Sequence, residues 1–129
     1  MSISFRLQLP RKLREEMIVH ARAELPNECV GLLAGVREGG MGRVVTRYPL
    51  VNEAASPIEY LSQPQSMFAA DRAMRQAGLD LLAIYHSHPA SAPIPSRKDL
   101  ERSYSPDVVN FIISLKDNSP LVRGWRKGG

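Results

Sequence analysis

The first residues of the chain alternate between hydrophobic and polar, and the pattern then changes to a helical period. Residues 3–9 place Ile, Phe and Leu at every second position, which predicts a half-buried strand that Pro10 ends. Over residues 11–25, apolar side chains recur at the spacing of one helix face, which predicts an amphipathic helix. Pro26 and Asn27 follow and are expected to stop this helix.

The next segments are short and mostly apolar, which is typical of strands. Residues 29–36 are predicted to form a buried strand. The glycine-rich residues 39–42 form a turn into a second strand at 43–50, so the two strands make a hairpin. Residues 57–64 read as a loop that contains a short extended piece.

The second half of the chain repeats the alternation of helices and strands. Apolar residues at helical spacing predict a helix around 67–77, which Gly78 caps in the left-handed conformation. The order of elements predicts an α/β fold of the mixed α+β kind, a mixed β-sheet with helices packed against it. The remaining predicted elements are a strand at 81–85, a proline-spaced loop at 90–95, a short helix from about Arg97, and strands at 108–115 and 121–126.

Length and composition favour one globular domain. The chain has 129 residues, of which 43% are hydrophobic and 23% charged, so we expect a single folded domain over residues 1–129. The longest apolar runs fall short of the ~20 residues that a membrane-spanning helix needs. The N-terminus lacks an apolar core with a cleavage site, and Cys29 is the one cysteine, so we expect a cytoplasmic protein without disulfides.

The chain is basic, with a formal net charge of +4. Such a balance can favour nucleic-acid binding through phosphate neutralisation. The basic residues are scattered, however, and no tract of five or six forms a stripe. We therefore expect neither a nucleic acid nor a membrane as partner.

His86 and His88 are the first candidates for chemistry. They lie two residues apart at the end of an apolar strand, so both imidazoles point to one side and Ser87 points to the other. Two histidines on one side of a strand can converge on a metal ion, and Pro89 ends the strand there. A single histidine, such as His20, is better interpreted as a packed core or surface residue.

Asp99 follows His88 after ten intervening residues and has two interpretations. Ser96 and Asp99 fit a capping box at the start of a short helix, which needs no metal. Asp99 is also a suitable third zinc ligand, and two histidines with one carboxylate suggest an open, catalytic site. Cys29 could close such a site, but a lone buried cysteine is more often a small hydrophobic residue.

These residues resemble the JAMM metalloprotease family, also called MPN-plus. The family pattern is an upstream glutamate, then His-x-His, ten residues and Asp, with a serine three residues before the Asp. Here the pattern reads Glu28, then His86 and His88, then Ser96 and Asp99. Nearly the whole chain is similar to the small prokaryotic members. The resemblance implies a three-layer arrangement like that of cytidine deaminases.

The resemblance also implies a mechanism. His86, His88 and Asp99 would hold a Zn²⁺ ion that leaves one position for water. Glu28 would be the general base, and Ser96 would donate a hydrogen bond to the oxygen that gains negative charge. Ser87 faces away from the metal and is interpreted as structural.

The substrate implied by the resemblance is the amide bond after the C-terminal Gly-Gly of a ubiquitin-like or sulfur-carrier protein. Residues 58–64 and 90–95 are candidate walls of a channel for this tail. Family members usually continue with another short strand, so we expect a domain truncated at its C-terminus. We also predict that the protein can form a homodimer.

Two other functions remain open. The same fold without its ligands serves as a scaffold or interaction module, and bound zinc would discriminate this case. A zinc nucleobase deaminase also combines zinc with a glutamate, but its His-x-Glu and Pro-Cys-x-x-Cys patterns do not occur in this sequence.

Overall fold

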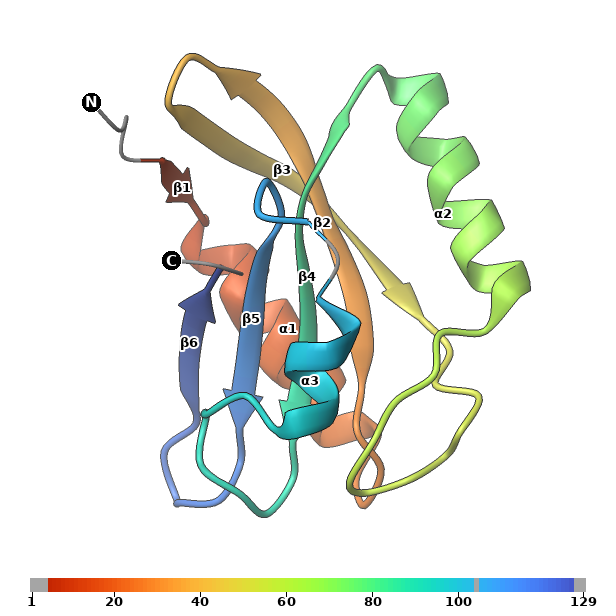
Figure 1. The fold of residues 1–129 in the computed structure, drawn as a ribbon, viewed down its shortest axis with the longest axis vertical. Coiled ribbons are helices and arrows are strands. Elements are labelled where there is room, and N and C mark those ends of the chain that lie inside the picture. Colours follow the sequence, from red (N-terminus) through yellow and green to blue (C-terminus); the bar gives the residue numbers. More distant parts are fainter. Residues whose placement is uncertain (1–4, 104, 127–129) are drawn as a thin grey trace.

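The computed structural model describes residues 5–103 and 105–126, which form a curled mixed sheet and three helices (Figure 1). Residues 3 and 4 of the first predicted strand and the last three residues of the expected domain lie outside the described part. In chain order the elements are β1 (Arg6–Gln8), α1 (Arg11–Ala23), β2 (Val30–Glu38), β3 (Met41–Leu50), α2 (Pro64–Ala77), β4 (Asp80–His88), α3 (Arg97–Arg102), β5 (Val109–Ser114) and β6 (Leu121–Trp125).

The six strands follow the order β1-β3-β2-β4-β5-β6. The hairpin of β2 and β3 is antiparallel, as are β2 with β4 and β5 with β6. The pairs β1–β3 and β4–β5 are parallel. The predicted mixed sheet and the predicted hairpin are therefore confirmed, and β4 lies in the interior of the sheet.

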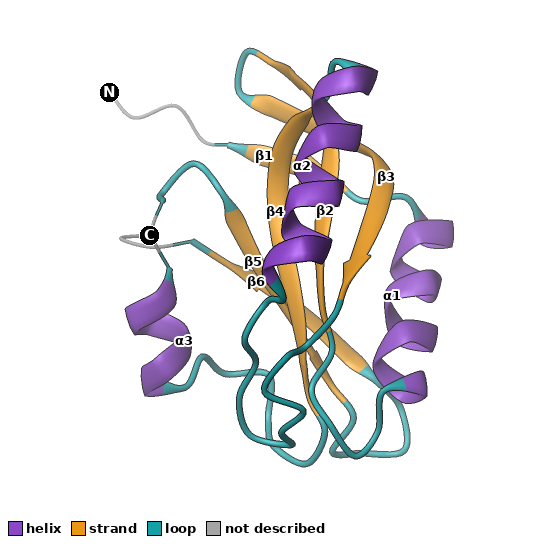
Figure 2. Ribbon diagram, turned by 90° about the vertical axis from the view of Figure 1, so that its right-hand side faces the viewer, coloured by secondary structure: helices purple, strands orange, loops and turns teal. Residues whose placement is uncertain are grey.

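Helices cover both faces of the sheet, which confirms the three-layer expectation (Figure 2). The buried face of α1, with Met17, Ile18 and Ala21, packs on one side of the sheet. Ala70 and Met74 of α2 pack on the other side. Figure 2 shows α3 and α1 on opposite sides of the sheet. Helices α1 and α2 thus bury their apolar faces against the sheet, whereas the one buried residue of α3 is Asp99.

The ends of the helices follow local chemistry. Gly78 ends α2 with φ 68°, the left-handed conformation that its lack of a Cβ allows, as predicted. Helix α1 ends at Ala23, two residues before the predicted end at Leu25. Leu25 precedes Pro26, and the proline ring disfavours the helical conformation at the residue before it. The part of the chain that the structure describes contains no helix with the length and apolar character of a membrane span.

Gly31 is required for the packing of Tyr85. The two residues lie opposite one another in β2 and β4, and a Cβ at Gly31 would collide with the Tyr85 ring. Tyr85 cannot move away easily, because it is fully buried and its hydroxyl accepts a hydrogen bond from Arg47 Nη1 at 3.0 Å. The same hydroxyl lies 2.6 Å from His20 Nδ1, so His20 is a packed residue with a partner, as interpreted from the sequence.

We therefore expect Gly31→Ala to destabilise the protein by about 1–3 kcal/mol, the usual cost of overpacking a core. Urea denaturation of both proteins measures the difference. In a Tyr85→Ala background the collision is absent, so the same substitution should cost much less. Equal costs in both backgrounds would contradict this explanation.

Candidate metal centre

The end of β4 presents two histidines on the face of the sheet that α2 covers. Ile84 packs against the core cluster that contains Ala70 and Met74 of α2. His86 and His88 follow Ile84 at alternate positions on the same strand. Both histidines are buried, and their backbone pairs with β5 residues Ile112 and Ser114. The strand thus holds the two imidazoles on a rigid, internal support.

Asp99 reaches the same place from α3. Ser96 caps this helix: its Oγ accepts a hydrogen bond from Asp99 N–H at 3.1 Å, and its N–H donates to Asp99 Oδ2 at 2.9 Å. The predicted capping box is therefore present. The cap also fixes the Asp99 side chain, so capping and metal binding are compatible at this residue.

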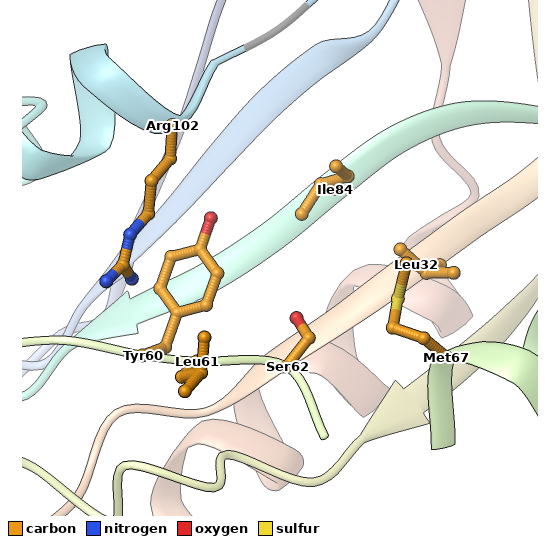
Figure 3. A pocket seen from close by; sticks show the side chains of 7 residues that line it. All are labelled: Leu32, Tyr60, Leu61, Ser62, Met67, Ile84 and Arg102. Atoms are coloured by element: carbon orange, nitrogen blue, oxygen red, sulfur yellow. The ribbon is translucent and has the colours of Figure 1, made fainter. Parts of the chain in front are cut away.

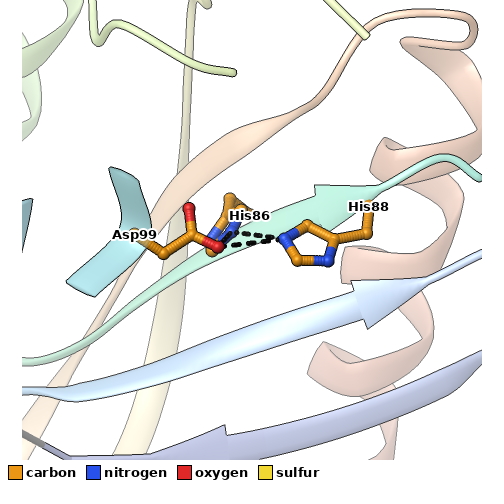
Figure 4. A group of neighbouring side chains, drawn as sticks. All are labelled: His86, His88 and Asp99. Atoms are coloured by element: carbon orange, nitrogen blue, oxygen red, sulfur yellow. Dashed lines mark hydrogen bonds and ion pairs between the residues drawn. The ribbon is translucent and has the colours of Figure 1, made fainter. Parts of the chain in front are cut away.

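Three possible ligand atoms form a nearly equilateral triangle (Figure 4). His86 Nε2 and His88 Nε2 are 3.2 Å apart, and they lie 3.1 Å and 3.0 Å from Asp99 Oδ2. Ligand atoms of a tetrahedral zinc ion lie about 2.0–2.1 Å from the metal, hence about 3.3 Å from one another. The three side chains could therefore bind one metal ion.

The protonation of His88 also fits a cation at this position. Its Nδ1 lies 2.9 Å from the carbonyl oxygen of Ala92, which can only accept, so Nδ1 carries the proton. In a neutral His88 the Nε2 lone pair then faces the Oδ2 atom of Asp99. Two lone pairs at this distance repel one another unless a proton or a metal ion lies between them. The Ala92 carbonyl thus orients His88 as a metal ligand.

The pKa shifts of Asp99 and His88 also show that this cluster favours a positive charge between its side chains. Burial opposes ionisation of Asp99, but its hydrogen bonds with His86 and His88 outweigh burial and hold the Asp99 pKa well below its usual range. Burial also opposes the charged form of His88, yet the hydrogen bonds to Asp99 and Ala92 raise the His88 pKa. Without a metal, a proton therefore stabilises this cluster.

Glu28 lies beside these residues. β2 and β4 are antiparallel, and Val30 lies opposite His86. Glu28, two residues before Val30, therefore comes opposite His88, two residues after His86, and on the same face of the sheet. Its side chain is buried, and within the described residues its Oε1 atom has no hydrogen-bond partner. Burial raises the pKa of Glu28 from 4.5 to about 7, with His88 opposing this shift and Asp99 adding to it. Glu28 is thus able to exchange a proton near neutral pH.

Cys29 does not join the cluster. Among the described residues, the group whose ligand atoms converge contains His86, His88 and Asp99 only. The Cys29 side chain packs on the opposite face, in the core cluster that contains Met17, Ile18 and Ala21 of α1, and burial raises its pKa to about 12. It behaves as the small buried hydrophobic residue that we expected, not as a thiolate ligand.

A cavity of about 280 Å³ lies on the same face, and one of its lining residues, Tyr60, contacts the His86 ring (Figure 3). The segment predicted as its first wall, residues 58–64, supplies three lining residues, whereas the second predicted wall, 90–95, does not line this cavity. The latter segment instead provides Ala92, which binds His88. The cavity is lined by Leu32, Tyr60, Leu61, Ser62, Met67, Ile84 and Arg102.

Two contacts join α3 to this first wall. The guanidinium of Arg102 stacks on the Tyr60 ring at 5.2 Å, and the Tyr60 ring lies 4.9 Å from that of His86. Lys98 forms an ion pair with Glu59. Sequence reasoning missed Arg102 and Tyr60. Arg102 follows Asp99 by one helical turn, a spacing that could have pointed to it, whereas no local pattern marks Tyr60.

Known proteins are similar to this chain in sequence and in fold. The family of prokaryotic homologues of the JAB domain (Prok-JAB) matches residues 10–127. A probable TtuB-protein conjugate cleaving protease from Thermus thermophilus is 44% identical over 75% of this chain, and the match spans 63% of the relative's length. A desampylase from Haloferax volcanii is 36% identical over 95% of this chain and 89% of its own. A CysO-cysteine peptidase from Mycobacterium tuberculosis is 35% identical over 78% of this chain and 68% of its own.

Solved structures agree with the sequence matches. A protein from Desulfitobacterium hafniense has a TM-score of 0.83 at 36% identity and covers 96% of this chain, with 85% of its own chain matched. A JAB1/MPN domain protein from Archaeoglobus fulgidus has a TM-score of 0.54 at 18% identity over 95% of this chain and 88% of its own, which shows a shared fold. From the family match and these relatives, the chain belongs to the prokaryotic JAB-domain family, as its resemblance to JAMM proteins indicated.

Proposed function

We propose that this protein is a zinc-dependent peptidase or isopeptidase. It cleaves the amide bond after the C-terminal Gly-Gly of a ubiquitin-like or sulfur-carrier protein. One observation carries the proposal: three convergent ligand atoms lie beside a buried carboxylate whose Oε1 atom has no partner within the described residues. The relatives named for cleaving conjugates and CysO-cysteine support the reaction class.

In this proposal His86, His88 and Asp99 hold the zinc ion. Zinc accepts imidazole nitrogen and carboxylate oxygen as ligands, and three protein ligands leave one position for solvent. A zinc ion supplies a Lewis acid here, which makes a water molecule easier to deprotonate near neutral pH.

Glu28 is the general base. Its carboxylate accepts a proton from the attacking water and later passes this proton to the leaving amine. Burial keeps the pKa near the operating pH, at about 7, and a cation nearby favours the ionised form that accepts the proton. The register opposite His88 and the raised pKa of this side chain support the role.

Ser96 is the proposed hydrogen-bond donor to the reacting carbonyl. Its Oγ accepts the N–H of Asp99, which leaves the hydroxyl proton to be donated elsewhere. Because the capping contact ties Ser96 to Asp99, the hydroxyl stays next to the metal ligands. We propose that it donates to the carbonyl oxygen as negative charge develops there.

We expect Ser96→Ala to lower kcat by about 10²–10³-fold, the usual effect of losing one such donor. The substitution also removes a helix cap, which costs about 0.5–2 kcal/mol of stability, so kcat is measured where both proteins are fully folded. Ser96→Thr keeps the hydroxyl and is the matched control. A normal kcat in Ser96→Ala would leave Ser96 with its capping role alone.

The cavity that Tyr60 lines is the proposed site for the carrier's tail. Its walls are mostly apolar, and glycine residues next to the cleaved bond let the main chain approach the metal ligands closely. Leu61, which lines the cavity, is 54% exposed, and two more apolar side chains on the segments that supply lining residues, Ile58 and Phe68, are 76% and 71% exposed. We propose that these exposed apolar side chains help to dock the body of the carrier.

The test uses carriers fused through their C-terminal Gly-Gly to a short reporter peptide. TtuB and CysO are the carriers to try first, because relatives are named for them. We expect the zinc-loaded protein to cleave after the second glycine, as mass spectrometry of the products would show. A chelator should abolish cleavage, and a fusion with Ala-Ala in place of Gly-Gly should resist it. Zinc-loaded protein that cleaves none of these fusions would overturn the proposal and favour a scaffold role.

Location and oligomeric state belong to the same proposal. The single cysteine is free and buried, which is compatible with the reducing cytoplasm that we propose. The homodimer stays a prediction, and the molar mass of the purified protein by light scattering tests it.

A further inference from the structure

The hydrogen-bond ladder between β2 and β4 changes at Cys29 and Ser87. In a regular antiparallel pair of this kind, the two residues exchange both backbone N–H···O bonds. Here one bond is regular, from Ser87 N–H to the Cys29 carbonyl at 3.2 Å. The other is not, because Cys29 N–H donates to the Ser87 hydroxyl oxygen at 2.8 Å. The side chain of Ser87 thus replaces its own carbonyl as the acceptor.

This change lies just before the first residue of β2, next to Glu28, the proposed base. β2 begins at Val30, so Glu28 and Cys29 lie just outside the ladder. The Glu28 main chain is otherwise held by the neighbouring loop: its N–H donates to the Ser56 carbonyl at 2.8 Å, and its carbonyl accepts from Asn52 Nδ2 at 3.0 Å. The two bonds between Cys29 and Ser87 therefore link the Glu28 segment to the strand that carries the histidines.

Ser87 is well suited to this link. Its side chain is fully buried and points to the face opposite His86 and His88, so it contacts neither the metal ligands nor a substrate on their face. It can act on the site only through the main chain to which it is bonded. Cys29 is 1% exposed, so water cannot readily replace the Ser87 hydroxyl as acceptor when a substitution removes it.

We propose that Ser87 is a positioning residue for Glu28. Its hydroxyl holds Cys29 N–H and so sets the separation between the Glu28 carboxylate and the two histidines across the ends of β2 and β4. This inference rests on the proposed function, in which Glu28 must reach a water molecule beside the metal ligands. A shift of about 1 Å in such a group can cost about 100-fold in rate.

The test compares Ser87→Ala, which removes the acceptor, with Ser87→Thr, which keeps it. We expect Ser87→Ala to lower kcat on the cleaved carrier fusion by about 10- to 100-fold, with KM and zinc content unchanged. Ser87→Thr should recover most of the lost kcat. Cys29→Ala is the matched control: it removes a buried side chain from the same pair but keeps the N–H···Oγ bond, so its kcat should stay normal.

A second readout does not depend on activity. Amide hydrogen exchange of Cys29, measured by NMR on metal-free protein, should be slow in the wild type and in Ser87→Thr. It should be at least about tenfold faster in Ser87→Ala, because the N–H has lost its acceptor.

The two readouts separate the possible failures. Fast exchange in Ser87→Ala with a normal kcat would overturn the positioning role, as would equally slow exchange in both proteins. An equal loss of kcat in Cys29→Ala would also overturn it, since packing would then explain the effect. If the wild type cleaves no fusion, the proposed function fails, while the Cys29 exchange still decides whether the hydroxyl holds this residue.

Discussion

Glu28→Gln is expected to lower cleavage of the carrier fusion by about 10²–10⁴-fold, the contribution of a general base, while zinc content stays at that of the wild type. The amide has almost the size and shape of the carboxylate, so the packing around residue 28 is preserved. It cannot accept a proton, which is the step assigned to Glu28. Steady-state cleavage rates and elemental analysis of the same preparation measure both expectations.

The matched control is Glu53→Gln, which makes the same change at an exposed glutamate of the neighbouring loop. Its activity should equal that of the wild type. Normal cleavage by Glu28→Gln would remove Glu28 from the mechanism, and loss of zinc together with activity would assign it a role in metal binding instead.

The same variant has a second, pH-dependent effect on stability. Burial raises the Glu28 pKa in the folded protein from its ordinary 4.5 to about 7, so ionisation of Glu28 opposes folding. Metal-free wild type should lose this part of its stability as the pH rises from about 4.5 to about 7. Glu28→Gln lacks the titration, so the difference in unfolding free energy between the two proteins should grow in the variant's favour over that range. A difference that is constant with pH would contradict this.

Asp99→Asn is expected to weaken zinc binding by more than about 100-fold, because loss of a direct ligand exceeds the 10- to 100-fold usual for residues that only orient ligands. The amide oxygen is a much poorer ligand than the carboxylate Oδ2 that lies 3.1 Å and 3.0 Å from the two histidines. It can still accept the Ser96 N–H, so most of the helix cap should remain. Competition with a chromophoric chelator measures the affinity.

Asp71→Asn provides the control for this experiment. Asp71 lies on α2 in an exposed ion pair with Arg75 at 3.0 Å, and its loss should leave zinc affinity unchanged. Unchanged affinity in Asp99→Asn as well would return Asp99 to the capping role alone.

Much of the fold is visible in local patterns. The hairpin of β2 and β3, the α2 helix ending at Gly78 and the strand that carries His86 and His88 all follow from periodicity, glycine and proline. The capping box of Ser96 and Asp99 is equally local, since its hydrogen bonds join residues three apart. Such features depend on backbone geometry within a few residues, so they can be read without the rest of the chain.

The environment of Glu28 illustrates what local patterns miss. In sequence it is one acidic residue at a helix-to-strand turn, for which the ordinary expectation is a solvated carboxylate. Only the pairing of β2 with β4, whose paired residues are 45 to 56 positions apart, brings it opposite His88 and buries it. Burial then raises its pKa. The resemblance to JAMM proteins pointed to Glu28, but composition and spacing did not.

By itself, then, the sequence determined the elements, the shared side of the two histidines and the cap that fixes Asp99. The tertiary structure alone decided that α3 packs where Asp99 Oδ2 lies within 3.1 Å of the Nε2 atoms of both histidines. It also decided that Tyr60 and Arg102 line one cavity and that Ser87 bonds to Cys29. The physical reason is range: periodicity and caps arise from neighbours along the chain, whereas these contacts arise from the order of strands in the sheet, which no local pattern specifies.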